Sequence, residues 1–201
     1  MGSARRSMSE FDFPLSIVLG VGLAAATGFR VFLPMLVVSG AAYAGHLPLD
    51  ENFAWLGTAS ALTMLSVAAL AEILAYYIPG VDNLLDALAT PAAVVAGTIV
   101  SAAVITDVPP IVKWTAAVIA GGGVAGVTQG VTAILRAKST ILTGGVGNAL
   151  ISTAEFVGAV LVSVLALAAP LAALGVVIVF LWLAIRLIRY LLGGPPSDTP
   201  K

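Results

Sequence analysis

Six long apolar stretches dominate the sequence, and each is long enough to cross a lipid bilayer as a helix. A crossing helix needs about 20 apolar residues, because it rises about 1.5 Å per residue through a hydrocarbon core about 30 Å thick. We expect spans over 14–43, 57–78, 84–106, 111–136, 149–168 and 171–192, with Pro170 dividing the last apolar run. The predicted fold is an all-α, polytopic membrane helix bundle of about six transmembrane helices.

Composition agrees with this fold class and excludes several others. Hydrophobic residues make up 60% of the 201 residues and charged residues 9%, whereas soluble domains carry about a quarter charged residues. Nine Lys and Arg with a net charge of −1 exclude a nucleic-acid partner, and the absence of Cys excludes disulfides and thiolate sites. We expect one transmembrane domain, 14–192, between a cytoplasmic segment, 1–13, and a disordered cytoplasmic tail, 193–201.

The basic residues predict the orientation of the bundle. Six crossings would place both termini on one face, and Lys113 alone would lie on the other, with Arg30 inside the membrane. The basic residues on the face of the termini would be Arg5, Arg6, Arg136, Lys138, Arg186, Arg189 and Lys201. Cytoplasmic loops carry the excess of Lys and Arg. We therefore expect a plasma-membrane protein with both termini in the cytoplasm.

Small residues spaced four apart predict close helix packing in two spans. They are Gly20, Ala24 and Gly28 in the first span and Gly122, Gly126 and Gly130 in the fourth. Such ridges let helix backbones approach within lipid. The alternatives are that they line a pathway or form the seam of a homo-oligomer. Separately, residues 80–85 resemble residues 145–150, which indicates a weak internal hairpin repeat.

Three ionisable residues fall inside predicted spans: Arg30, Glu72 and Glu155. Charges within a membrane are costly and are therefore candidates for a substrate or ion pathway. In this hypothesis the two glutamates hold protons or cations, and Arg30 is the anion contact or counter-ion. Three uncharged groups would complete the polar cavity: Thr27, Gln129 and Thr153. The alternative is a buried Arg–Glu pair that fixes helix register. Pro34 predicts a kink at Arg30.

A second polar group and the absence of enzyme motifs complete the prediction. Asp82, Asn83 and Asp86 either form a cation site at the cytoplasmic mouth or cap a helix.

The sequence contains no His-Glu-x-x-His motif, no Gly-x-Ser-x-Gly motif and no phosphate-binding or dinucleotide-binding loop. We expect no enzymatic activity, no cofactor and no metal centre.

Four sequence blocks carry a resemblance to a known family: 27–34, 76–86, 90–97 and 121–123. Together they resemble a bacterial integral membrane family catalogued as domain of unknown function 4126, over most of residues 14–190. The resemblance implies a multi-spanning membrane protein and assigns no catalytic residue. Residues 28–34 are also similar to the Gly-Arg-Phe-x-Pro loop of the DedA family, which resembles a lipid-carrier translocase, with the arginine displaced by one position.

These features predict a transporter or channel for a small solute or ion, with proton or cation coupling. Its partners would be the lipid bilayer and the transported species. One alternative is translocation of a lipid headgroup, with Arg30 contacting phosphate. The other is a non-transporting membrane scaffold or complex subunit whose glycine ridges bind other helices.

Overall fold

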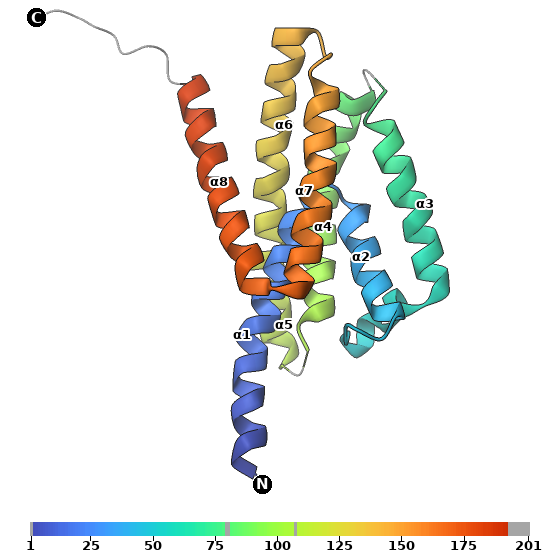
Figure 1. The fold of residues 1–201 in the computed structure, drawn as a ribbon, viewed down its shortest axis with the longest axis vertical. Coiled ribbons are helices and arrows are strands. Elements are labelled where there is room, and N and C mark those ends of the chain that lie inside the picture. Colours follow the sequence, from blue (N-terminus) through green and yellow to red (C-terminus); the bar gives the residue numbers. More distant parts are fainter. Residues whose placement is uncertain (1, 79–80, 107, 193–201) are drawn as a thin grey trace, which may run out of the picture.

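The computed structural model describes residues 2–78, 81–106 and 108–192, and their side chains except for residues 2–13, 82, 83, 188, 191 and 192. These residues form helices and connecting turns, with no β-strand among them, which confirms the all-α class. The helices form one elongated bundle (Figure 1). In chain order they are α1 Gly2–Thr27, α2 Phe32–Tyr43, η1 Glu51–Gly57, α3 Ala59–Ala75, α4 Val81–Val104, α5 Pro110–Ala116, the π-helical η2 Ala117–Gly122, α6 Gly123–Thr143, α7 Asn148–Ala168 and α8 Pro170–Leu192.

Four helical segments in the described chain are long and apolar enough to cross a membrane. They are Leu84–Val104, Pro110–Thr143, Asn148–Ala168 and Pro170–Leu187. A fifth results if η1 and α3, which are bent by 68° at their junction, are counted as one span. The segment predicted as 111–136 is longer than expected, because α6 continues to Thr143 before Gly144, at φ +64°, ends it.

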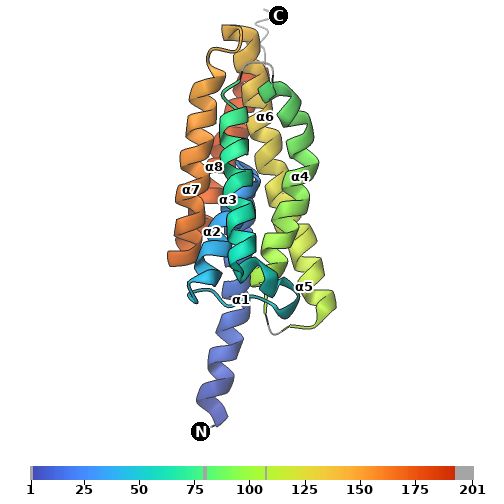
Figure 2. The same ribbon diagram turned by 90° about the vertical axis from the view of Figure 1, so that its right-hand side faces the viewer.

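The predicted single helix over 14–43 is wrong, because this stretch forms two short helices. The apolar part of α1, Pro14–Thr27, runs into the bundle, and α2 runs back out toward η1 (Figures 1 and 2). Leu19 in α1 and Leu49, which follows α2, line one cavity, so the outer ends of the two helices lie together. We call α1, α2 and their connecting turn the re-entrant hairpin, a name that refers here to the path of the chain into and out of the bundle.

Close packing and hydrogen bonding at residues 28–32 explain the reversal. A Cβ on Gly28 would lie 2.5 Å from the carbonyl oxygen of Ala125, so the chain needs glycine at this approach. The backbone N–H groups of Val31 and Phe32 donate to Glu72 on α3 and not to the preceding helix. Pro34 is tolerated because it lies in the first turn of α2. The expected kink is therefore a complete break.

The bundle has two distinct ends, which we name by their residues. The η1 end carries η1 and the start of α8 at Pro170, and the Gly144 end carries the α6–α7 turn and the end of α8 (Figure 1). The described chain thus begins and ends at opposite ends of the bundle, whereas six crossings would place both termini on one face. Three of the basic residues behind that prediction, Arg5, Arg6 and Lys201, lie outside the described side chains.

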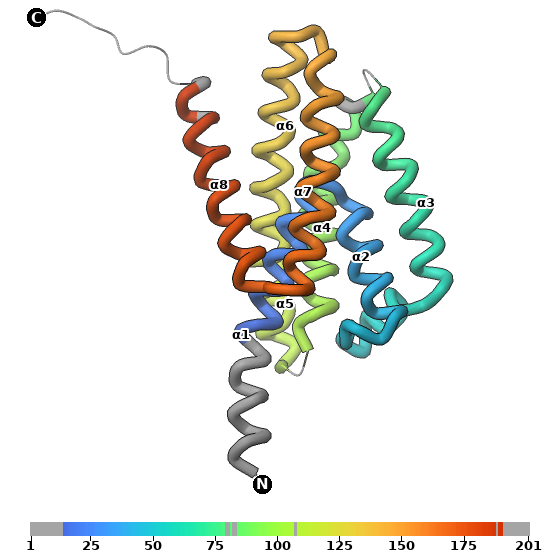
Figure 3. The backbone as a smooth tube through the Cα atoms, in the orientation of Figure 1, coloured from blue at the N-terminus to red at the C-terminus, as the bar shows by residue number. Residues whose placement is uncertain are grey.

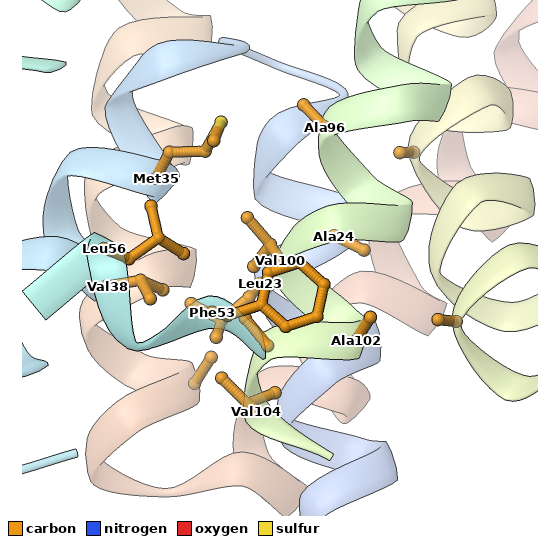
Figure 4. Close-up of a cluster of buried hydrophobic side chains, with 14 of the residues drawn as sticks. Leu23, Ala24, Met35, Val38, Phe53, Leu56, Ala96, Val100, Ala102 and Val104 are labelled. Carbon is orange, nitrogen blue, oxygen red and sulfur yellow. The ribbon is translucent and has the colours of Figure 1, made fainter. Parts of the chain in front are cut away.

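The apolar part of α1 packs against α4, α7 and α8 within the bundle (Figure 3), and its side chains contribute to the hydrophobic core (Figure 4). Leu23 and Ala24 of α1 are completely buried against Val100 of α4 and residues of α2 and η1. A Cβ on Gly20 would lie 3.2 Å from Ser101 of α4. The first glycine ridge is thus closely packed at both ends, on α4 at Gly20 and on α6 at Gly28.

The second ridge, on η2 and α6, is closely packed over part of its length. Cβ atoms on Gly122 and Gly126 would lie 2.5 Å from Thr98 Oγ1 and 2.9 Å from Val94 Cγ2, both on α4. A Cβ on Gly130 would meet nothing within 4 Å. The end of α3 and the start of α4 lie at the same end of the bundle as the α6–α7 turn, but an internal repeat of 80–85 and 145–150 stays a prediction.

Candidate functional site

Arg30 lies at the tip of the re-entrant hairpin, buried inside the bundle with 1% of its surface exposed. Its Nη2 donates a 2.9 Å hydrogen bond to the Ser152 carbonyl and lies 3.5 Å from Glu155 Oε2. The guanidinium carbon lies 4.0 Å from the centre of the Tyr76 ring. Its Nε and Nη1 have no hydrogen-bond partner in the described part of the chain. Unpaired buried donors are rare, and a water or a ligand commonly satisfies them.

Arg136, which the sequence placed on the cytoplasmic face, is buried beside Arg30 with 1% exposure. It lies inside the bundle because α6 extends seven residues past it to Thr143. Its Nε lies 2.9 Å from Asp86 Oδ2, and its Nη1 donates a 2.7 Å hydrogen bond to Ser152 Oγ. Its Nη2 donates to Glu155 Oε2, and its guanidinium also stacks on Tyr76, at 4.6 Å.

Glu155 connects the two arginines. One oxygen, Oε2, interacts with both Arg30 and Arg136, while Oε1 is buried with no hydrogen-bond partner among the described residues. The carboxylate therefore offsets two buried positive charges from a single atom. Replacing a buried ion pair with apolar groups often leaves stability unchanged or raises it, so such a cluster is weak evidence for a purely structural role.

Glu72, predicted as a proton or cation site, holds the hairpin through its two oxygens. Oε1 accepts a 2.7 Å hydrogen bond from the Val31 N–H, and Oε2 accepts a 3.0 Å hydrogen bond from the Phe32 N–H. These are N–H groups at the start of α2, where a negative charge is favoured by the helix dipole. We call Arg30, Glu72, Tyr76, Arg136 and Glu155 the charged centre.

No hydrogen bond or ion pair links the other predicted pathway residues to Arg30 among the described residues; its contacts there include Ser152, Glu155 and Tyr76. Thr27 is buried and donates to the Ala24 carbonyl, and Gln129 is buried on α6. Thr153 hydrogen-bonds the Tyr77 hydroxyl at 2.9 Å on the exposed side of α7.

Of the three residues of the predicted cation site at the cytoplasmic mouth, only Asp86 has a side chain among the described residues. The side chains of Asp82 and Asn83 lie outside the described residues. The Asp86 carboxylate pairs with Arg136. The parts of the chain that the structure describes contain no group of three or more His, Cys, Asp or Glu residues arranged to hold a metal ion.

A groove between α3 and α4 leads to Glu72. We call it the α3–α4 groove; its volume is about 360 Å³. Residues along it include Phe32, Ala71, Glu72, Tyr76, Leu88 and Ala92. A larger cavity of about 900 Å³ lies at the η1 end, beneath the outer end of the hairpin. The charged centre is thus approached by an apolar groove from the side.

A separate ion pair fixes the η1 end. Lys113 Nζ of α5 donates a 2.7 Å hydrogen bond to Asp50 Oδ2, and both side chains are largely buried. Partial burial raises the pKa of the Asp50 carboxyl. Hydrogen bonds from Lys113 and Asn52 together lower this pKa by more than burial raises it, so the pKa lies below its ordinary value. The Asp50 N–H also donates to the Ala103 carbonyl, which attaches the loop to α4.

Sequence reasoning missed Arg136 and Tyr76 because each lies near the end of a predicted span. A residue near a span end is typically an interfacial anchor. One signal for Arg136 was the absence of a helix-breaking residue between it and Gly144. The pairing of Arg136 with Asp86, fifty positions earlier, had no sequence signal.

Comparison with known proteins identifies one family. The sequence model described as "Domain of unknown function (DUF4126)" matches residues 17–190, which include the whole charged centre. No curated protein and no solved structure matches the chain.

Proposed function

We propose that this chain, which belongs to the DUF4126 family, is a multi-pass membrane transporter for a small solute or ion, and that the charged centre is its binding site. The single observation that carries the proposal is the position of Arg30. A re-entrant hairpin holds this arginine inside the bundle with Nε and Nη1 unpaired. Non-helical backbone at membrane depth is tolerated where it is buried in protein or lines a cavity, as in transporters.

We infer a topology of five crossings and one re-entrant hairpin. The crossings are η1 with α3, then α4, α5 through α6, α7 and α8. The Gly144 end carries Lys138, Arg186 and Arg189, whereas the η1 end carries Lys113, which is paired with Asp50, and the first turns of α1 bring Arg5 and Arg6 to that end as well. Because basic residues lie at both ends of the bundle, the positive-inside rule does not by itself assign either end to the cytoplasm.

The geometry supports a coupling mechanism between Arg30 and Glu155. In the present arrangement Glu155 Oε2 offsets part of the Arg30 charge, and Nε and Nη1 remain able to donate. A proton on Glu155 would remove that charge and strengthen the attraction of Arg30 for an anionic group. Release of the proton would then favour release of the anion. Arg30 is the anion contact in this mechanism, and Glu155 is the proton site.

Currents from reconstituted protein test the proposal. Liposomes containing the full chain are adsorbed on a solid-supported membrane and exposed to jumps in pH, Na⁺, chloride, phosphate and acetate. We expect a protein-dependent current for at least one jump, reduced at least tenfold by Arg30→Gln. The matched control is Lys138→Gln, which removes a positive charge outside the centre. Folded protein that gives no current with any jump would contradict the proposal.

A further inference from the structure

The α3–α4 groove opens sideways onto the surface that would face lipid. The principal packing partners of α3 are α2 and η1, so its flank toward α4 is left uncovered. Residues of the groove wall are exposed on both helices: Ala71 on α3, and Leu88 on α4 at 61%. The wall of the groove itself is built on α3 from small residues, Ala68 and Ala71 among them. An apolar chain lying along α3 would find space there.

Glu72 supplies the charge of this groove. Glu72 lines the groove and is 9% exposed as a residue, while Arg30 and Arg136 are 1% exposed and do not line it. Each Glu72 oxygen accepts one backbone N–H. A carboxylate offers about four lone-pair sites on its two oxygens, so Glu72 can accept further hydrogen bonds from the groove side. The groove therefore presents a negatively charged acceptor at the end of an apolar channel.

Glu72 lies in the part of α3 nearest the Gly144 end. It lies three residues before the end of α3 at Ala75, close to the Gly144 end of the bundle. A lipid whose headgroup lies at this end would direct its acyl chain down the groove toward Ala68. The charge selects an amine, because a carboxylate accepts from an ammonium and repels an anionic headgroup.

We propose that the α3–α4 groove is a specific site for a bilayer phospholipid with a primary-amine headgroup, of the phosphatidylethanolamine type. The ammonium donates to Glu72, and one acyl chain lies in the groove. This site goes beyond the proposed transport activity and does not depend on it, since lipid selectivity is measurable when no solute moves.

Spin-labelled lipids in vesicles containing the full chain test the site. The motionally restricted fraction is measured for phosphatidylethanolamine, phosphatidylcholine and phosphatidylglycerol carrying the same labelled acyl chain. We expect phosphatidylethanolamine to be favoured roughly tenfold over phosphatidylcholine, whose quaternary ammonium has the charge without the N–H donors. Glu72→Gln should abolish this preference, and Glu51→Gln, at an exposed carboxylate, should retain it.

A second variant keeps the test decisive if Glu72→Gln fails to fold. Ala71→Leu fills the groove without changing Glu72, and it should reduce the restricted phosphatidylethanolamine fraction to the level of phosphatidylcholine. Equal restriction of the amine and choline lipids by wild-type protein would overturn the proposal. A preference for phosphatidylglycerol, or a selectivity unchanged by both variants, would also overturn it.

Discussion

The backbone N–H of Val31 donates a 2.7 Å hydrogen bond to Oε1 of Glu72, forty-one residues later in the chain. Through this bond and the neighbouring one from Phe32, α3 caps the first turn of α2. The Glu72 side chain thereby stabilises the turn of the re-entrant hairpin that carries Arg30. The charged centre and the shape of the hairpin consequently depend on the same residue.

Glu72→Ala should destabilise the protein by about 3 kcal/mol, because it leaves two backbone N–H groups without their acceptor. Glu72→Gln keeps one amide oxygen as an acceptor and should lose less. Thermal unfolding in detergent measures both, with Glu51→Ala as the exposed control. Equal melting temperatures for Glu72→Ala and the wild type would show that the cap contributes nothing.

Arg136→Gln should also be strongly destabilising, by about 3–5 kcal/mol, because it leaves Asp86 and Glu155 without their shared cation. Lys138→Gln, two residues later, is the matched control. The double variant Arg136→Gln with Glu155→Gln should recover part of the loss, since the buried carboxylate at position 155 is neutralised as well. Additive losses in this double-mutant cycle would exclude coupling between Arg136 and Glu155.

Gly28→Ala should reduce stability by about 1–3 kcal/mol, since its Cβ would lie 2.5 Å from the Ala125 carbonyl oxygen and 2.5 Å from Thr128 Cβ. Gly130→Ala makes the same chemical change where the new atom meets nothing within 4 Å. The control should be neutral or slightly stabilising, because alanine is the better helix former. Comparable losses at both positions would argue against close packing of the hairpin tip on α6.

The Asp50–Lys113 ion pair predicts a stability that depends on pH. The pKa of Asp50 is lowered in the folded protein, so its stabilising contribution is present above the ordinary aspartate pKa and is lost as the pH falls through the lowered value. Asp50→Asn should therefore lower the melting temperature at pH 7 and have little effect at pH 2. A difference between variant and wild type that is the same at both pH values would contradict this linkage.

The sequence predicted much of the fold because membrane crossing leaves a strong signal. Four of the expected spans correspond to helices long and apolar enough to cross a membrane, and a fifth does if η1 and α3 count as one span, since apolar length decides them. The first expected span, 14–43, does not correspond to one helix. Its sequence is as apolar as that of a crossing helix, so apolar length alone predicted a single span there. What breaks it is packing at Gly28 and capping by Glu72, and both depend on distant residues.

The candidate site was predicted in part for a similar reason. Arg30, Glu72 and Glu155 stood out as charges inside apolar runs, and the structure brings them to one region. Arg136 was taken for a residue at the membrane face because it lies close to a polar segment. Its burial follows from the length of α6 and from its partners, Asp86 and Glu155. Neither the length of α6 nor the identity of these partners could be predicted from the residues next to Arg136 in the sequence.

Labelling of single cysteines from one side of the membrane tests the re-entrant hairpin most directly. The chain has no cysteine, so Leu15→Cys, Glu51→Cys and Val146→Cys each place one thiol, and all three positions are exposed. A membrane-impermeant maleimide should modify positions 15 and 51 from the same side and position 146 from the other. Modification of position 15 from the side of 146 would mean that residues 14–43 cross the membrane, which would contradict the hairpin and the position it gives Arg30.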